Sequence, residues 1–221
     1  MSETRRSAWL CASAFVAGAT VAPPFDRLAD ASFAWHMLQH LILFFIVPLL
    51  ALLGRPFDLF VALAGKARTA SFVVRTKPLH VLGSIPVAYA ALLIAFWGTH
   101  FSPLYDLALR NEAVHVCEHA LYVLMGTLFW LPVLAPPPLV PLPYPVRVFY
   151  LFACLPQSAL VGAILFSARA PLYAHYAAIA GPVRALAQQH DAAAIMWIGG
   201  GLLLLCAMLS TMHAWAMREA S

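Results

Sequence analysis

The 221 residues are 63% hydrophobic and only 10% charged, with a mean hydropathy of +0.83. A soluble domain has about 45–50% apolar and about 25% charged residues, so the composition excludes a water-soluble globular fold. The apolar residues lie in long runs, which excludes a disordered chain. The net charge of +4 does not indicate nucleic-acid binding, because the basic residues lie in connecting loops, where membrane topology accounts for them.

Apolar runs of roughly 20 residues, the length of a membrane span, occur about six times. In chain order they cover residues 7–22, 32–53, 79–97, 111–134, 146–166 and 192–216. Because the runs are continuously apolar rather than alternating, they predict helices and not barrel strands. The first run also fits a signal peptide, but we expect it to be retained. The sequence therefore predicts an all-α, polytopic transmembrane bundle that forms one integral membrane domain over residues 1–221.

The distribution of basic residues predicts the orientation of this bundle. With a cytoplasmic N-terminus, the inner side carries nine of the 13 Lys and Arg residues and the outer side the remaining four, Arg27, Arg110, Arg169 and Arg184. This bias follows the positive-inside rule, so loops 23–31, 98–110 and 167–191 are predicted to face outward. Segment 54–78 holds five of the nine inner cations and is predicted to be an amphipathic cytoplasmic loop on membrane lipid. Segment 135–145 contains six prolines and is predicted to be a non-helical cytoplasmic connector.

Two of the predicted spans carry a histidine pair near their outer ends, in the pattern H-x-x-[Q/E]-H. Residues i and i+4 project from nearly the same face of a helix, so each pair can direct two imidazoles at one ion. Both spans run inward from the outside, which predicts that the pairs meet at equal depth. Ionisable residues at membrane depth are costly and usually face a bundle interior or a wet cavity. The pattern therefore predicts a metal site formed by His36, His40, His115 and His119.

The ligand chemistry narrows the identity of the metal. Imidazoles suit copper, iron, nickel or zinc and do not suit magnesium or calcium. Met37 is a further potential thioether ligand for Cu(I), although packing is the simpler interpretation. The other candidate ligands or orienting groups are Gln39, His100, Cys117, Glu118, Asp191 and Met196. Two alternatives remain: a b-type haem held by one histidine from each helix, and a di-iron membrane oxidoreductase with a histidine cluster.

Five segments, in order from about residue 30 to 200, resemble the polytopic CtaG family of cytochrome c oxidase assembly factors. They are Trp-His-Met-Leu-Gln-His at 35–40, His-Phe-Ser-Pro-Leu-Tyr-Asp at 100–106, His-Val-Cys-Glu-His at 115–119 with Phe-Trp-Leu-Pro at 129–132, Pro-Leu-Tyr-x-x-Tyr at 171–176, and Asp191 before Met196-Trp197. The positions that match the family pattern are His36, Gln39, His40, His100, His115, Glu118, His119, Tyr173 and Asp191.

The resemblance implies a multi-pass protein of a bacterial-type inner membrane that helps to mature a haem–copper oxidase, with a connection to copper. It implies an assembly factor or metallochaperone rather than an enzyme. Its expected partners are an oxidase subunit and a periplasmic copper carrier. Relative to the family pattern we identify no seventh span and no appended copper-binding domain within these residues, so the resemblance does not say how the chain acquires copper.

Overall fold

A computed structural model describes residues 2–58, 77–137 and 139–220, and this part of the chain forms helices and no β-strand. The predicted all-α class is confirmed. By length and composition, four helices are suited to cross a membrane: Phe33–Leu53, Glu112–Leu134, Tyr144–Ser167 and Pro182–Glu219. The bent pair α1 (Glu3–Val21) and α2 (Phe25–Ala31) makes a fifth if it counts as one span.

The predicted span 79–97 is divided in the structure. It consists of the end of α7 (Lys77–Leu82), a turn, and α8 (Ile85–Leu93), which η2 (Ile94–Gly98) continues. Pro86 lies in the first turn of α8, where the backbone N–H has no hydrogen-bond partner within the helix and its absence is tolerated. A helix that began before Pro86 could not continue through it without losing a hydrogen bond. The continuous apolar helix Ile85–Gly98 is therefore shorter than the four long ones, and the count of six spans stays a prediction.

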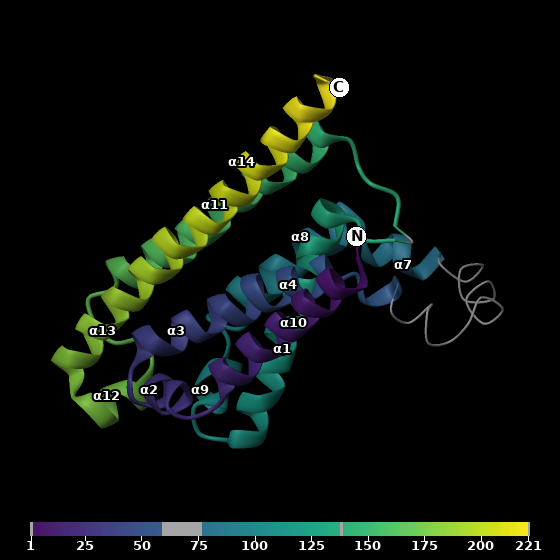
Figure 1. The fold of residues 1–221 in the computed structure, drawn as a ribbon. Coiled ribbons are helices and arrows are strands. Elements are labelled where there is room, and N and C mark those ends of the chain that lie inside the picture. The colour runs from purple at the N-terminus through teal and green to yellow at the C-terminus, as the bar shows by residue number, and fades with distance from the viewer. Residues whose placement is uncertain (1, 59–76, 138, 221) are drawn as a thin grey trace.

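The last long helix begins earlier than the sequence indicated. The run of α13 (Pro182–Ala194), η3 (Ile195–Gly199) and α14 (Gly200–Glu219) is continuous, so the last ten residues of the predicted loop 167–191 are helical. A proline at the start and an alanine-rich sequence both favour this helix. It packs antiparallel along α11 (Tyr144–Ser167), and the two form the long pair at the upper left of Figure 1.

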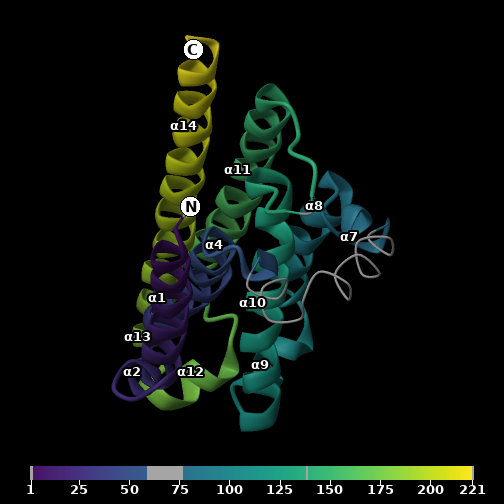
Figure 2. The same cartoon turned by 45° about the vertical axis from the view of Figure 1, so that its right-hand side comes forward.

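Several helices pack around the span formed by α3 (Phe33–Leu41), η1 (Ile42–Ile46) and α4 (Val47–Leu53). Helices α8 and α10 (Glu112–Leu134) contact each other, α10 and α1 contact α4, and α13 contacts α3. The short helices α2, α9 (Pro103–Ala108) and α12 (Ala174–Ala180) gather at one end of the molecule, far from the C-terminus (Figures 1 and 2). We call this end the histidine end. The loops predicted to face outward all lie there, and its outward orientation remains a prediction.

Three π-helical turns, η1, η2 and η3, interrupt the helices at the centre of the bundle. A π-turn shifts the backbone hydrogen-bond register and often occurs at functional sites. In each turn a backbone carbonyl accepts a side-chain hydrogen bond: Trp130 Nε1 donates to Phe45 O at 2.9 Å, Thr99 Oγ1 to Ala95 O at 2.6 Å, and Ser158 Oγ to Met196 O at 2.7 Å. The irregular backbone is thus satisfied inside the protein, as it must be within a membrane.

The two loops predicted on the opposite side are described to different extents. Most of segment 54–78 lies outside the described residues; at its start, Asp58 pairs with Arg55 at 2.8 Å and with Arg6 at 3.6 Å. Helix α10 ends at Leu134, and residues 135–137 and 139–143 form no helix before α11 begins. Prolines in this connector prevent a helix from continuing.

The close approach of α10 to η1 depends on a glycine. A Cβ atom at Gly126 would lie 2.0 Å from the carbonyl oxygen and 2.8 Å from the carbonyl carbon of Phe44, both backbone atoms. We therefore expect Gly126→Ala to lower stability by about 3 kcal/mol, at the upper end of typical overpacking costs. Gly201→Ala is the control, because a Cβ there meets nothing within 4 Å. Thermal unfolding of both variants in detergent measures the difference, and equal melting temperatures would contradict this packing.

Candidate metal centre

Helices α3 and α10 present their histidine pairs in the same register. His36 is the fourth residue of α3 and His115 the fourth of α10, whose start is capped by Asn111 Oδ1 accepting from Val114 N at 3.2 Å. The ring of His36 stacks on that of His115, with centroids 5.2 Å apart. One turn further in, the rings of His40 and His119 lie 5.7 Å apart, nearly perpendicular. The two pairs therefore meet at equal depth, as predicted.

Three of the four histidines form a compact cluster, which we call the histidine trio: His36, His40 and His115. One ring nitrogen from each lies within 4.8 Å of the others, and all three side chains are buried. The predicted convergence is confirmed. Because metal–nitrogen bonds near 2 Å hold two ligands about 3–4 Å apart, the three imidazoles need only a small rearrangement to bind one ion. His119 lies next to the trio, its ring 4.2 Å from that of His115.

The polar atoms of this cluster lack partners among the described residues. Both ring nitrogens of His36 and His40, Nε2 of His115 and His119, and both carboxylate oxygens of Glu118 are buried without a hydrogen bond. Buried polar groups are nearly always paired, and each unpaired one costs about 1–3 kcal/mol. Glu118 Oε2 lies 3.9 Å from His40 Nε2, beyond hydrogen-bonding distance. A cation bound by the imidazoles would satisfy the nitrogens and balance this buried carboxylate, so the residues present fit a metal ion.

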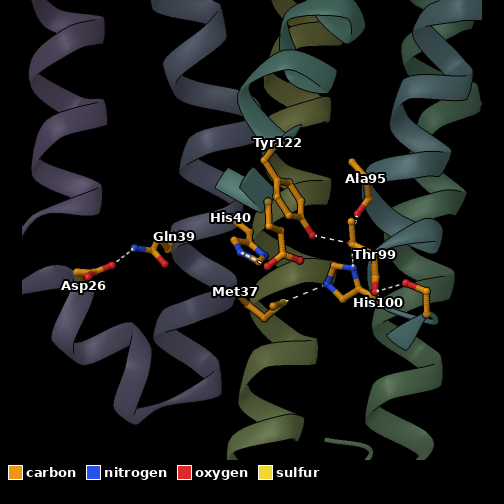
Figure 3. Close-up of polar contacts among 10 residues, drawn as sticks. Asp26, Met37, Gln39, His40, Ala95, Thr99, His100 and Tyr122 are labelled. Carbon is orange, nitrogen blue, oxygen red and sulfur yellow. Dashed lines mark hydrogen bonds and ion pairs between the residues drawn. The ribbon is translucent and has the colours of Figure 1, made fainter. Parts of the chain in front are cut away.

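A second polar group adjoins the trio around His100 (Figure 3). His100 Nδ1 lies 3.0 Å from Thr99 Oγ1, and His100 Nε2 lies 3.3 Å from the sulfur of Met37. Thr99 Oγ1 also contacts the hydroxyl of Tyr122 at 2.8 Å, and the Tyr122 ring stacks on His40 at 4.1 Å. Burial lowers the pKa of His100 to about 4, so its imidazole is neutral at physiological pH and able to bind a metal.

A surface cavity at the histidine end shares one lining residue, His115, with the trio. Its volume is about 420 Å³, and its polar lining comes from Asp30 of α2, the α9–α10 turn, Glu112 and His115 of α10, and His175 of α12. We call it the vestibule. The lining holds two carboxylates, of Asp30 and Glu112, and one guanidinium, of Arg110, so with neutral histidines its net formal charge is negative and attracts cations. Two larger cavities, of about 470 and 620 Å³, have mostly apolar linings without a histidine.

The structure separates the remaining predicted residues into two groups. Met196 and His100 lie at the site, because both line one small cavity with His40. Gln39 lies away from it: its side chain donates to Thr20 O at 2.9 Å and to Asp26 Oδ1 at 3.1 Å, toward α1 and α2 (Figure 3). The last two, Cys117 and Asp191, are exposed, and Asp191 lies inside α13.

Sequence reasoning missed two residues at the site. Tyr105 of α9 is fully buried, with its ring 5.5 Å from that of His36 and 5.6 Å from that of His100. Thr99 bridges His100 and Tyr122. Both residues lie in or next to the segment His-Phe-Ser-Pro-Leu-Tyr-Asp at 100–106, and its resemblance to the family pattern was the one sequence signal that could have identified them. Residue spacing in a turn does not show which side chains face inward.

Comparison with known proteins places the chain in a family. The family model described as cytochrome c oxidase caa3 assembly factor (Caa3_CtaG) matches residues 1–218. An uncharacterized protein of Mycobacterium bovis is 25% identical over 231 residues, covering 97% of this chain and 34% of the relative. One of Mycobacterium leprae is 28% identical over 208 residues, covering 86% and 31%. The chain thus spans about a third of the length of these relatives. No solved structure matches it significantly. Because the family model covers nearly every residue, both histidine pairs included, the chain belongs to the cytochrome c oxidase caa3 assembly factor family.

Proposed function

We propose that this protein binds a copper ion at the histidine trio and supplies it during assembly of a haem–copper oxidase. The observation that carries the proposal is the set of three buried imidazoles with ligand atoms within 4.8 Å of one another. Five of their six ring nitrogens are buried without a hydrogen bond among the described residues, and imidazole is a ligand for copper rather than for magnesium or calcium. His119 and Glu118 are the nearest additional ligands. Membership of the oxidase assembly family supplies the cellular context.

The vestibule supports loading of the site from the histidine end. The net negative charge of its lining, from Asp30 and Glu112 against Arg110, attracts a cation. His115 is the trio ligand that lines the vestibule. If this end faces outward, as the basic residues predict, the donor is a periplasmic copper carrier and the acceptor an oxidase subunit in the same membrane. The predicted outward orientation of this end and the family membership support this choice of partners.

The geometry favours a single ion over haem. Organic ligands occupy cavities of about 300–1,000 Å³, whereas the cavity between His40 and His100 has a volume of about 10 Å³. The vestibule is larger, but its lining includes His115 of α10 and no histidine of α3, so it does not offer one histidine from each paired helix. The rings of His36 and His115 are already stacked at 5.2 Å, which leaves no slot for a macrocycle between them. A di-iron centre with a histidine cluster holds two ions and therefore needs more ligands than one ion does. In the part of the chain that the structure describes, the trio is the one group of three or more potential metal ligands whose ligand atoms lie within 4.8 Å of one another. Among the described residues, only Glu118 places a carboxylate within 4.0 Å of a trio nitrogen.

Metal binding by the purified protein tests the proposal. The wild type, the double variant His36→Ala/His115→Ala and the control His213→Ala, whose histidine is exposed on α14, are titrated with Cu(I) against a competing chelator. We expect the double variant to bind copper at least tenfold more weakly and the control to match the wild type. Unchanged affinity in the double variant would refute the trio as the site. A Soret band with stoichiometric iron, in protein purified from its own membranes, would favour haem instead.

A further inference from the structure

A small buried cavity lies beside the trio, and its polar lining differs chemically from the trio itself. Its potential ligands are Met37 and His40 of α3, His100, and Met196 of η3. All four side chains are at least 96% buried. The cavity volume of about 10 Å³ is close to that needed for one water-sized particle. An ion is therefore the kind of ligand that fits.

The hydrogen bonds around Thr99 fix the protonation pattern of His100. The Thr99 hydroxyl has one hydrogen, and it donates this hydrogen to Ala95 O at 2.6 Å, because a carbonyl can only accept. Thr99 Oγ1 must then accept from His100 Nδ1, at 3.0 Å. In a neutral imidazole with its hydrogen on Nδ1, the other nitrogen, Nε2, carries a free lone pair. His100 Nε2 therefore presents a lone pair, not a hydrogen, to its neighbour.

That neighbour is the sulfur of Met37, 3.3 Å from His100 Nε2. A thioether sulfur has no hydrogen, so two lone pairs face each other at this distance and no hydrogen bond can form between them. Figure 3 shows the two side chains pointing toward each other, with His40 beside them. Both nitrogens of His40 are also without a hydrogen bond. Electron-pair donors that converge in this way form a site for a cation.

The backbone around the cavity is specialised as well. Each of the three π-turns contributes one lining residue: Phe44 from η1, Phe96 from η2 and Met196 from η3. A π-turn rotates the side chains that follow it relative to a regular α-helix. Three such turns from separate helices therefore meet around one cavity.

We infer that Met37, His40, His100 and Met196 form a second metal position, a thioether subsite selective for Cu(I). This inference rests on the proposed copper-binding function and deepens it by naming the oxidation state and a second set of ligands. Thioether sulfur is a soft ligand that favours Cu(I), whereas a site of imidazoles alone also accepts Zn(II) and Cu(II). His40 belongs to both positions, so a copper ion moves from the trio to the subsite by exchanging the other ligands around this one histidine.

Substituting the two methionines tests the subsite without removing a histidine. Met37→Leu/Met196→Leu conserves volume, so the fold should tolerate it at a cost below about 1.5 kcal/mol per site. The matched control is Met125→Leu/Met208→Leu, because both methionines are partly buried and pack against the same hydrophobic core. Each purified protein is loaded with Cu(I) or Zn(II), affinities are measured by chelator competition, and copper ligands are identified by X-ray absorption.

We expect sulfur in the copper coordination of the wild type and of the control. In Met37→Leu/Met196→Leu we expect this sulfur signal to be lost and Cu(I) affinity to fall at least tenfold, while Zn(II) affinity, which depends on the trio, stays within twofold. Copper bound only through nitrogen in the wild type, or unchanged Cu(I) affinity in the variant, would overturn the subsite and leave the trio standing. A wild type that binds neither metal would overturn the proposed function as well.

Discussion

Replacing His40 and His119 together with alanine is expected to abolish nearly all cytochrome c oxidase activity in cells that depend on this protein. His40 is a trio ligand and lies in the thioether subsite, and His119 is the nearest substitute, with its ring 5.7 Å from that of His40. Each single variant keeps part of the cluster and should lose only part of the activity. The oxidase polypeptide should remain in the membrane, because loss of copper does not prevent insertion of apolar helices.

Oxygen consumption, measured with an oxidase substrate and normalised to oxidase polypeptide on immunoblots, gives the result. The His213→Ala variant, altered at an exposed position of α14, should match the wild type. Added copper is expected to restore part of the activity in the single variants. Full oxidase activity in the double variant under copper limitation would show that the protein does not handle copper, and a scaffold role through helix contacts would then explain its place in the family.

The convergence of the histidine pairs could be predicted because it depends on local rules. The i, i+4 spacing puts each pair on one helix face, and the equal distance from each helix start sets equal depth. Which flank of that face meets the partner helix depends on tertiary packing. Gln39 and Glu118 hold equivalent positions, one residue before the second histidine of each pair, yet Gln39 turns toward Asp26 and α1, while Glu118 turns toward His40.

The contacts made by Met37 could not be predicted from spacing. Met37 and His100 are 63 residues apart, and their approach depends on where η1 and η2 shift the register of their helices. Composition gives no signal for a π-turn. The start of α13 could not be predicted from hydropathy either. Its amphipathic, alanine-rich sequence has the hydropathy of a polar loop, but residues Pro182–Ala194 are helical.

The Glu118→Gln variant should separate metal binding from fold stability. The Glu118 side chain is buried, and neither carboxylate oxygen has a hydrogen bond among the described residues. A buried carboxyl group without a hydrogen bond destabilises the metal-free protein, so the neutral, isosteric amide should leave the melting temperature of that form unchanged or raise it. If Glu118 balances the charge of a bound ion, the same substitution should weaken Cu(I) binding by about 10–100-fold.

Thermal unfolding with and without saturating Cu(I) reports both effects in one experiment, because a ligand of the folded state stabilises it by RT ln(1 + [L]/Kd). A hundredfold loss of affinity lowers the metal-induced stabilisation by about 2.7 kcal/mol at fixed copper concentration. Glu3→Gln, at an exposed position in the first turn of α1, should leave the copper-induced stabilisation unchanged and lower stability by no more than about 0.3–1 kcal/mol, the contribution of a first-turn charge. A Glu118→Gln protein that is less stable without metal, yet gains as much from copper as the wild type, would assign this carboxylate to packing and remove it from the metal centre.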